Sequence, residues 1–202
     1  MPQAQPLELR EDPQSGVQIN GLSVFEVTQK DQIFELLAKG NANRTQEQTR
    51  QNQTSSRSHA VLIIKYRKDC SAVYGSESQL AKSGKLSLID LAGSERASKN
   101  GNTGQRMKEG ACINKSLLAL GNCINLLYEN ARCGQHKHVP FRDSKLTRIL
   151  KESLIGNSKT LMIANVSPAS QNYEDTLNTL KYANRTKDLK TKIKKNIVAQ
   201  SN

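Results

Sequence analysis

The sequence predicts an α/β fold in which strands and helices alternate around a central, mostly parallel sheet that is flanked by helices. Two short apolar runs, 86–89 and 161–164, carry hydrophobic residues on both faces, as central strands of such sheets do. Between about 109 and 129, apolar residues recur at steps of four and three, which is typical of a helix that packs one face on a core. With 202 residues, 36% of them hydrophobic, the chain is long enough to bury such a core.

Turn-forming and helix-capping residues separate the predicted elements along the chain. Residues 7–11 and 17–19 are predicted to form a small hairpin, because the segment between them is rich in turn-forming residues. A helix is predicted over 31–39, with Gly40 as its C-cap. The remaining predicted elements are a strand at 60–66, a polar surface loop at 69–84, a strand at 86–89, the helix at about 109–129, a buried strand at 160–166 and a helix at 173–189.

Asp90 and Gly93 stand just beyond the strand at 86–89. Ligands of open α/β sheets bind at the carboxyl ends of the strands, where Asp90 is expected. Gly93 has no Cβ, so its N–H could approach a terminal phosphate, and Asp90 could hold Mg²⁺ directly or through water. The alternative is a plain strand followed by a turn, because Asp-x-x-Gly is a common pattern.

A second polar segment, residues 52–59, reads Asn-Gln-Thr-Ser-Ser-Arg-Ser-His and leads straight into the strand at 60–66. Its hydroxyls, guanidinium and imidazole can supply ligands for Mg²⁺, donors for phosphate oxygens and a partner for Glu95. By itself such a segment is also compatible with a serine-rich, solvated loop.

The two segments together resemble the two switch loops of the kinesin motor superfamily, Asn-x-x-Ser-Ser-Arg-Ser-His and Asp-Leu-Ala-Gly-Ser-Glu, in the family's order. The resemblance extends from about 7 to about 190. Within it, 114–122 is similar to the family's relay helix, 140–148 to its principal tubulin-contacting loop and helix, 178–183 to its last helix, and 7–12 and 106–110 to the kinesin-8 group.

One motif of the family is missing from this sequence. Kinesin motors bind ATP through a P-loop, G-x-x-x-x-G-K-S/T, and here the only Gly-Lys pair, Gly84-Lys85, is followed by Leu86. In the family, the P-loop and the early strands lie upstream of the segment that resembles Leu7. The resemblance therefore implies a P-loop NTPase-like kinesin motor fold that lacks its N-terminal strands and P-loop.

The implied organisation has three parts: a disordered lead at 1–6, the C-terminal part of a kinesin motor domain at 7–190, and a basic tail at 191–202 similar to the start of a neck linker. Such a chain is either the switch and microtubule-binding half of an ATP-dependent motor or a non-catalytic tubulin-binding module. A microtubule-stimulated ATPase is implied for the family, whereas activity of this chain alone is not expected without a P-loop.

The resemblance implies roles for the switch residues toward ATP and Mg²⁺. The residues concerned are Asn52, Ser55, Ser56, Arg57, Ser58, Asp90, Gly93 and Glu95. Ser56 would ligate Mg²⁺, Asp90 would hold its hydration shell, and Ser55 would help to position the attacking water. Gly93 N–H would sense the γ-phosphate.

Closure and force transmission are implied for other positions. Arg57 and Glu95 would form a charge-assisted pair that closes the two switches over ATP. Asn114 would relay the movement of the switches toward the microtubule. Three basic residues, predicted to share one helical face through their spacing of three, would meet tubulin: Arg142, Lys145 and Arg148.

The charge of the chain agrees with a polyanionic partner. The formal net charge is +12, and basic residues cluster between 132 and 151 and between 181 and 195. A nucleic-acid interface would interleave aromatic residues for base stacking, but each cluster holds one aromatic residue, Phe141 or Tyr182. The acidic surface of tubulin is thus the better candidate, nucleic acid is an unlikely partner, and cytoplasm and microtubule cytoskeleton are the expected location. No membrane span or signal peptide is predicted.

Overall fold

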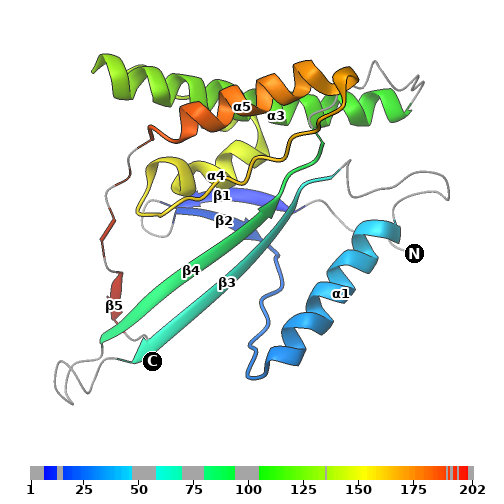
Figure 1. The fold of residues 1–202 in the computed structure, drawn as a ribbon. Helices are drawn as coiled ribbons and strands as arrows, with labels where there is room; N and C mark the ends of the chain where they lie inside the picture. Colours follow the sequence, from blue (N-terminus) through cyan, green and yellow to red (C-terminus); the bar gives the residue numbers. More distant parts are fainter. Residues whose placement is uncertain are drawn as a thin grey trace.

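A computed structural model describes residues 7–12, 16–46, 58–69, 80–93, 105–134 and 136–199, the last range without 190, 192 and 195. Figure 1 shows two regions. A helical layer with a short hairpin beside it occupies the upper part, and a long two-stranded ribbon extends downward from it, with one helix lying along the ribbon.

The hairpin consists of β1 (Glu8–Asp12) and β2 (Gly16–Asn20), paired antiparallel from Glu8↔Asn20 to Asp12↔Gly16. This confirms the predicted hairpin. Each strand extends one residue further toward the turn than predicted. Gly16 has a φ of 75°, in the left-handed region that glycine adopts without strain, and a Cβ there would collide with the side chain of Glu152.

The ribbon consists of β3 (Ala60–Asp69) and β4 (Leu80–Asp90), and the short β5 (Ile197–Ala199) pairs with the far end of β4. All pairings among the described residues are antiparallel. The expectation of a mostly parallel sheet is therefore wrong for this part of the chain. The physical reason is the connection: the chain between Asp69 and Leu80 is shorter than the dozen or so residues that a parallel crossover requires.

The predicted strand at 160–166 is also wrong. Its residues belong to no strand, and Leu161 and Ile163 are 85% and 77% exposed. A strand needs a hydrogen-bonding neighbour, and within the described residues none pairs with this segment.

The helices are longer at some ends and shorter at others than the sequence predicted. Helix α1 (Lys30–Gln46) continues through Gly40, which is therefore not a C-cap. Helix α3 covers Gln105–Cys133, and α5 covers Tyr173–Thr186, three residues short of the predicted end. Short 3₁₀ turns, η3 (Phe141–Asp143) and η4 (Ser170–Asn172), precede α4 (Lys145–Ile155) and α5. No helix in the described ranges is long and apolar enough to cross a membrane.

The described core lies where α3, α4 and the upper end of β4 meet. Its buried residues are Leu120, Ile124, Leu146 and Leu150, with Ile89 and Leu154 packed against them. The strand predicted at 86–89 exists as part of the longer β4, so the surface loop predicted at 69–84 is wrong for 69 and for 80–84, and the strand is not buried on both faces. Side chains alternate along a strand, so Ile89 faces this core while Leu86 and Leu88 are 55% and 53% exposed.

Candidate functional site

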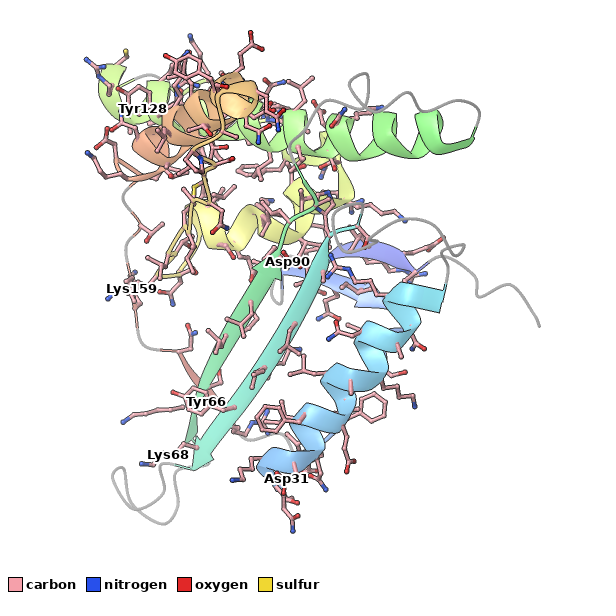
Figure 2. The ribbon with its side chains drawn as sticks, turned by 45° about the vertical axis from the view of Figure 1, so that its right-hand side comes forward. Asp31, Tyr66, Lys68, Asp90, Tyr128 and Lys159 are labelled. Carbon is pink, nitrogen blue, oxygen red and sulfur yellow. The ribbon has the colours of Figure 1, made fainter. Side chains whose placement is uncertain are left out.

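The predicted switch residues are only partly described. Those outside the described residues are Asn52, Ser55, Ser56, Arg57 and Glu95. Ser58 lies just before β3, Asp90 is the last residue of β4, and Gly93 follows three residues later. Because Ala60 pairs with Asp90, the antiparallel ladder brings the start of one switch-like segment beside the end of the other. Figure 2 shows Asp90 at that end of β4, next to the helical layer.

Arg44, near the end of α1, joins the two segments. Its Nε donates to Ser58 Oγ at 2.8 Å and its Nη2 donates to the carbonyl oxygen of Ser58 at 2.6 Å. Its Nη1 donates to Asp90 Oδ2 at 3.0 Å. The Arg44 side chain is only 18% exposed, whereas that of Asp90 is 68% exposed. A planar guanidinium with several fixed donors suits this role, because one side chain fixes both segments at once.

The sequence prediction missed Arg44 because it ended the helix at Gly40. A glycine inside a helix costs about 1 kcal/mol relative to alanine but does not by itself end the helix. The available signal was the continuation Asn-Ala-Asn-Arg after Gly40, which places a basic residue in the last turn of α1, where the helix dipole favours it.

His59 makes the second connection, between the loop after β4 and α3. The backbone N–H of Ala92 donates to His59 Nδ1 at 3.0 Å, and His59 Nε2 lies 2.8 Å from Ser116 Oγ. An amide nitrogen can only donate, so Nδ1 carries no proton. The neutral ring therefore holds its proton on Nε2 and donates it to Ser116.

The surroundings favour this neutral form of His59. Burial of the ring lowers its pKa from the usual value, and the positive charge of Arg44 lowers it further, while the negative charge of Asp90 acts in the opposite direction. Protonation of Nδ1 would break the bond from the Ala92 N–H. Sequence reasoning assigned the imidazole no such connection, because Ser116 lies 57 residues further along the chain.

The described donors fit the chemistry of a hydrated Mg²⁺ ion. Asp90 offers an exposed carboxylate of which one oxygen is bound by Arg44, and Ser58 offers a hydroxyl beside it. Hard cations prefer such oxygen ligands and often retain water. Gly93 is half-buried, and the loop that contains it is fixed to His59 through Ala92.

Asn114, the predicted relay residue, lies half-buried in α3, two residues before Ser116. The helix that resembles the relay helix is thus joined to the loop after β4 by the hydrogen bond between Ser116 and His59. A direct contact of this kind is what a relay of switch movement requires.

The three predicted tubulin-binding residues do not share one helical face. Arg142 lies in η3, and Ser144, whose backbone is extended at φ −146°, separates it from α4, which carries Lys145 and Arg148. The separation has a local cause: the Ser144 hydroxyl accepts from Thr147 N, and Thr147 Oγ1 accepts from Ser144 N, so this capping box starts a new helix at Lys145.

All three basic side chains nevertheless reach β1 or the residue before it. Arg142 Nη2 donates to Glu11 Oε2 at 3.1 Å, Lys145 Nζ to the carbonyl of Leu7 at 3.3 Å, and Arg148 Nη2 to the carbonyl of Leu9 at 3.1 Å. Arg148 is half-buried, whereas the Arg142 side chain is 85% exposed. Lys145 is exposed as well, so Arg142 and Lys145 are both accessible to a partner.

Glu11 organises this basic face. It accepts from Lys151 at 2.5 Å as well as from Arg142. The hydrogen bond from Lys151 is the largest of the influences that lower the pKa of Glu11, followed by the bond from Arg142. The sequence indicated the basic cluster but not the acidic residue, which lies 140 positions away from Lys151.

Comparison with known proteins agrees with this geometry. The family model described as the kinesin motor domain matches residues 1–189. The chain is 53% identical over 192 residues to kinesin-like protein KIF19 of Homo sapiens and 54% identical over 194 residues to kinesin-like protein KIF18B of Gallus gallus, which covers 95% and 96% of this chain. A solved structure of a KIF14 dimer with AMP-PNP in complex with a microtubule is 46% identical, superposes with a TM-score of 0.85 and covers 94% of this chain.

The fold and these matches define the class of protein: the chain belongs to the kinesin motor domain family. Within that family it is most like the kinesin-8 group, to which both relatives belong. The chain spans 19% of KIF19, 24% of KIF18B and about half, 52%, of the KIF14 chain.

Proposed function

We propose that this chain supplies the switch and microtubule-contacting part of an ATP-driven kinesin motor that works on microtubules in the cytoplasm. The observation that carries the proposal is the set of hydrogen bonds made by the side chains of Arg44 and His59. Arg44 binds Ser58 and Asp90, His59 binds the Ala92 amide and Ser116 of α3, and the two sets of hydrogen bonds are joined because Ser58 and His59 are adjacent in the chain.

This arrangement suits a machine that senses a phosphate group. A change at Asp90 or at the loop holding Gly93 would be transmitted to α3 without an intervening flexible segment, because Ala92, His59 and Ser116 form consecutive hydrogen bonds. ATP supplies the γ-phosphate whose presence or loss drives such a switch. Asp90 and Ser56 would hold Mg²⁺, with Asp90 acting through water, while Asn52, Ser55 and Ser58 would line the nucleotide.

The proposed test uses a completed motor domain, in which the part that precedes Leu7 in the family is joined to this chain from a kinesin-8 relative. Arg57→Ala and Glu95→Ala should slow microtubule-stimulated ATP turnover at least about a hundredfold while nucleotide binding changes little, because the pair acts on closure and not on ground-state binding. The matched control is Lys39→Ala, which removes an exposed positive charge from α1, outside the switch segments and outside the basic cluster at 132–151. Normal turnover in both switch variants would contradict the proposed role.

A second candidate function is a tubulin-binding module that needs no nucleotide. It is favoured by the buried α3 and α4 core, which closes within the described residues, and by the exposed Arg142 beside it. The 202-residue chain alone would then co-sediment with microtubules whether or not ATP is added.

Arg142→Ala distinguishes a specific contact from general charge attraction. Compared with Lys39→Ala, which removes one positive charge from α1, it should weaken microtubule binding about two- to fivefold and reduce its salt dependence. Equal effects of the two variants would show that only net charge matters. Tight binding to oligonucleotides with no binding to microtubules would overturn both candidate functions.

A further inference from the structure

The end of the ribbon farthest from the helical layer carries a basic face that the proposed function does not use. Figure 2 shows Tyr66 and Lys68 there, well away from Asp90. Side chains alternate along a strand, so Tyr66 and Lys68 of β3 share one face with their ladder partners on β4, Gly84 and Lys82. These four residues are called the ribbon-end face below.

Two lysines stand directly opposite each other on this face. Lys68 is exposed, Lys82 is half-buried, and the antiparallel ladder pairs them. Directly opposite Cβ atoms lie about 5 Å apart, and like charges at such positions destabilise a ribbon. Within the part of the chain that the structure describes, no carboxylate forms an ion pair with Lys82. An anion bound between the two amines would offset this repulsion.

The opposite face of the ribbon shows which kind of anion suits such a pair. There Lys65 lies opposite Lys85, and Lys85 forms an ion pair with the carboxylate of Glu152 from α4. A carboxylate of the protein itself thus offsets one of the two cross-strand lysine pairs. Because α4 supplies it from one side of the ribbon, the ribbon-end face on the other side receives none from α4.

An aromatic side chain lies beside the second lysine pair. Tyr66 is 61% exposed, and its ring lies against the backbone of Gly84, where an added Cβ would be only 2.0 Å from a ring carbon. A residue larger than glycine would therefore displace the ring. The ribbon-end face thus combines an accessible aromatic surface with two cations.

These features fit an extended acidic peptide. Alternate side chains of an extended chain lie on one side, about 6.6–6.8 Å apart, and Tyr66 and Lys68 have the same spacing of two residues on β3. A peptide with a carboxylate between the lysines can therefore place an apolar side chain, two residues away, on the Tyr66 ring. A second copy of this chain is a poor occupant, because each copy carries a formal net charge of +12.

Lysines on an exposed ribbon can also serve only to discourage pairing with other strands. That role accounts for the lysines but not for an exposed tyrosine ring held against a glycine. We propose that the ribbon-end face binds an extended acidic segment of another protein, with a carboxylate between Lys68 and Lys82 and an apolar side chain on Tyr66. This surface is separate from the switch segments and from the basic residues of η3 and α4, so it does not depend on the proposed motor function.

Fluorescence anisotropy of the 202-residue chain with two labelled peptides tests the proposal. The probe is Ser-Glu-Thr-Leu-Thr-Glu-Ser, and in the control peptide glutamine replaces both glutamates. The control peptide should bind at least about tenfold more weakly, because hydrogen bonds to charged groups are the stronger ones. Binding of the probe should also weaken as salt is raised, since exposed charges are screened.

Variants of the chain locate the binding site. Lys82→Gln should weaken probe binding at least about fivefold, whereas Arg67→Gln, which removes the same charge from the opposite face of β3, should change it less than about twofold. Gly84→Ala should weaken binding by displacing the Tyr66 ring, and Tyr66→Phe should preserve it. Far-UV circular dichroism checks the fold, and Lys82→Gln decides the outcome if Gly84→Ala disturbs the ribbon.

Microtubule co-sedimentation separates this proposal from the proposed function. Lys82→Gln should leave it within about twofold, because Arg142 and Lys145 are unchanged. Equal binding of the two peptides, or equal weakening of probe binding by Lys82→Gln and Arg67→Gln, would overturn the proposal. Tighter binding of a single-stranded oligonucleotide or of an anionic vesicle than of the probe, lost in Lys82→Gln, would overturn it as well.

Discussion

The interface between α3 and α4 buries its apolar residues, whereas the middle of β4 leaves apolar residues exposed. Between α3 and α4, Ile124 and Leu146 are 5% and 6% exposed, whereas on β4 Leu86 and Leu88 are more than half exposed. The core between α3 and α4 is completed by Ile89 at the end of β4 and by Leu154, which all lie in described elements. The ribbon has one face without a cover among the described residues.

This difference in burial indicates which surface of the chain needs another element to cover it. A ribbon of two long strands and one short strand is marginally stable when one apolar face is open, and exposed apolar patches mark interaction surfaces. The chain spans about half, 52%, of the solved KIF14 structure it matches. We infer that the open face of β4 and the exposed segment 160–166 are where the rest of a motor domain packs.

The largest expected effect on stability comes from a Leu→Ala substitution, and it should differ between the two regions. Leu146→Ala should lower the free energy of unfolding by about 2–5 kcal/mol, because it leaves a cavity in a closed core. Leu88→Ala, the matched control on the ribbon, should cost less than about 1 kcal/mol because the side chain is already 53% exposed. Urea unfolding measures both, and equal costs would remove the distinction between the regions.

A smaller effect is expected at the start of α4. Ser144→Ala removes the capping box and should lower stability by about 0.5–2 kcal/mol. Ser87→Ala, on the ribbon, makes the same chemical change without removing a helix cap and should cost less. A similar loss in both variants would indicate that the cap does not define the boundary between η3 and α4.

The ion pair that joins the two regions should contribute less to stability than the helix cap at Ser144. Lys85 of β4 and Glu152 of α4 are 46% and 41% exposed, so Lys85→Gln should cost at most about 1 kcal/mol of stability. Urea unfolding measures this loss, with Lys65→Gln, an exposed lysine of β3, as the matched control. Equal losses in the two variants would show that the ion pair between Lys85 and Glu152 does not hold α4 against β4.

The smallest expected effect is a pH dependence of stability that arises from Glu11 of β1, in the hairpin beside the helical layer. The folded pKa of Glu11 is lowered by Lys151 and Arg142, so the unfolded chain binds its proton more readily. The contribution of Glu11 is present above its unfolded pKa, about 4.5, and is lost as the pH falls toward the lower folded value. Glu11→Gln should flatten the decline of stability below pH 4.5, as measured by urea unfolding at a series of pH values, and an unchanged decline in this variant would contradict the role of Glu11.

Local sequence signals identified the hairpin, β3, β4 and the helices that carry strong periodicity. They failed where a distant partner decides the structure. Residues 160–166 have the composition of a strand, yet a strand forms only beside another strand. The expected direction of the strands was wrong for the described part of the sheet, because the apolar pattern of 86–89 indicates burial and not which neighbour lies beside it.

The candidate site shows the same limit. The motif around Asp90 could be found because its residues are adjacent in the chain, and its position at the end of β4 is confirmed. The contacts of Arg44 and His59 span 46 and 57 positions, so no local pattern indicates them. The N-cap at Ser144, by contrast, has a local signal, because serine is favoured at that position, and it would have separated Arg142 from α4.

Amide exchange of the chain alone, compared with the same residues in a completed motor domain, tests most directly whether the ribbon is one face of a larger motor fold. We expect protection of β4 and of 160–166 to increase at least about tenfold in the completed domain, while the amides around Ile124 and Leu150 change little. Full protection of β4 in the isolated chain, or no gain at 160–166 in the completed domain, would contradict this account.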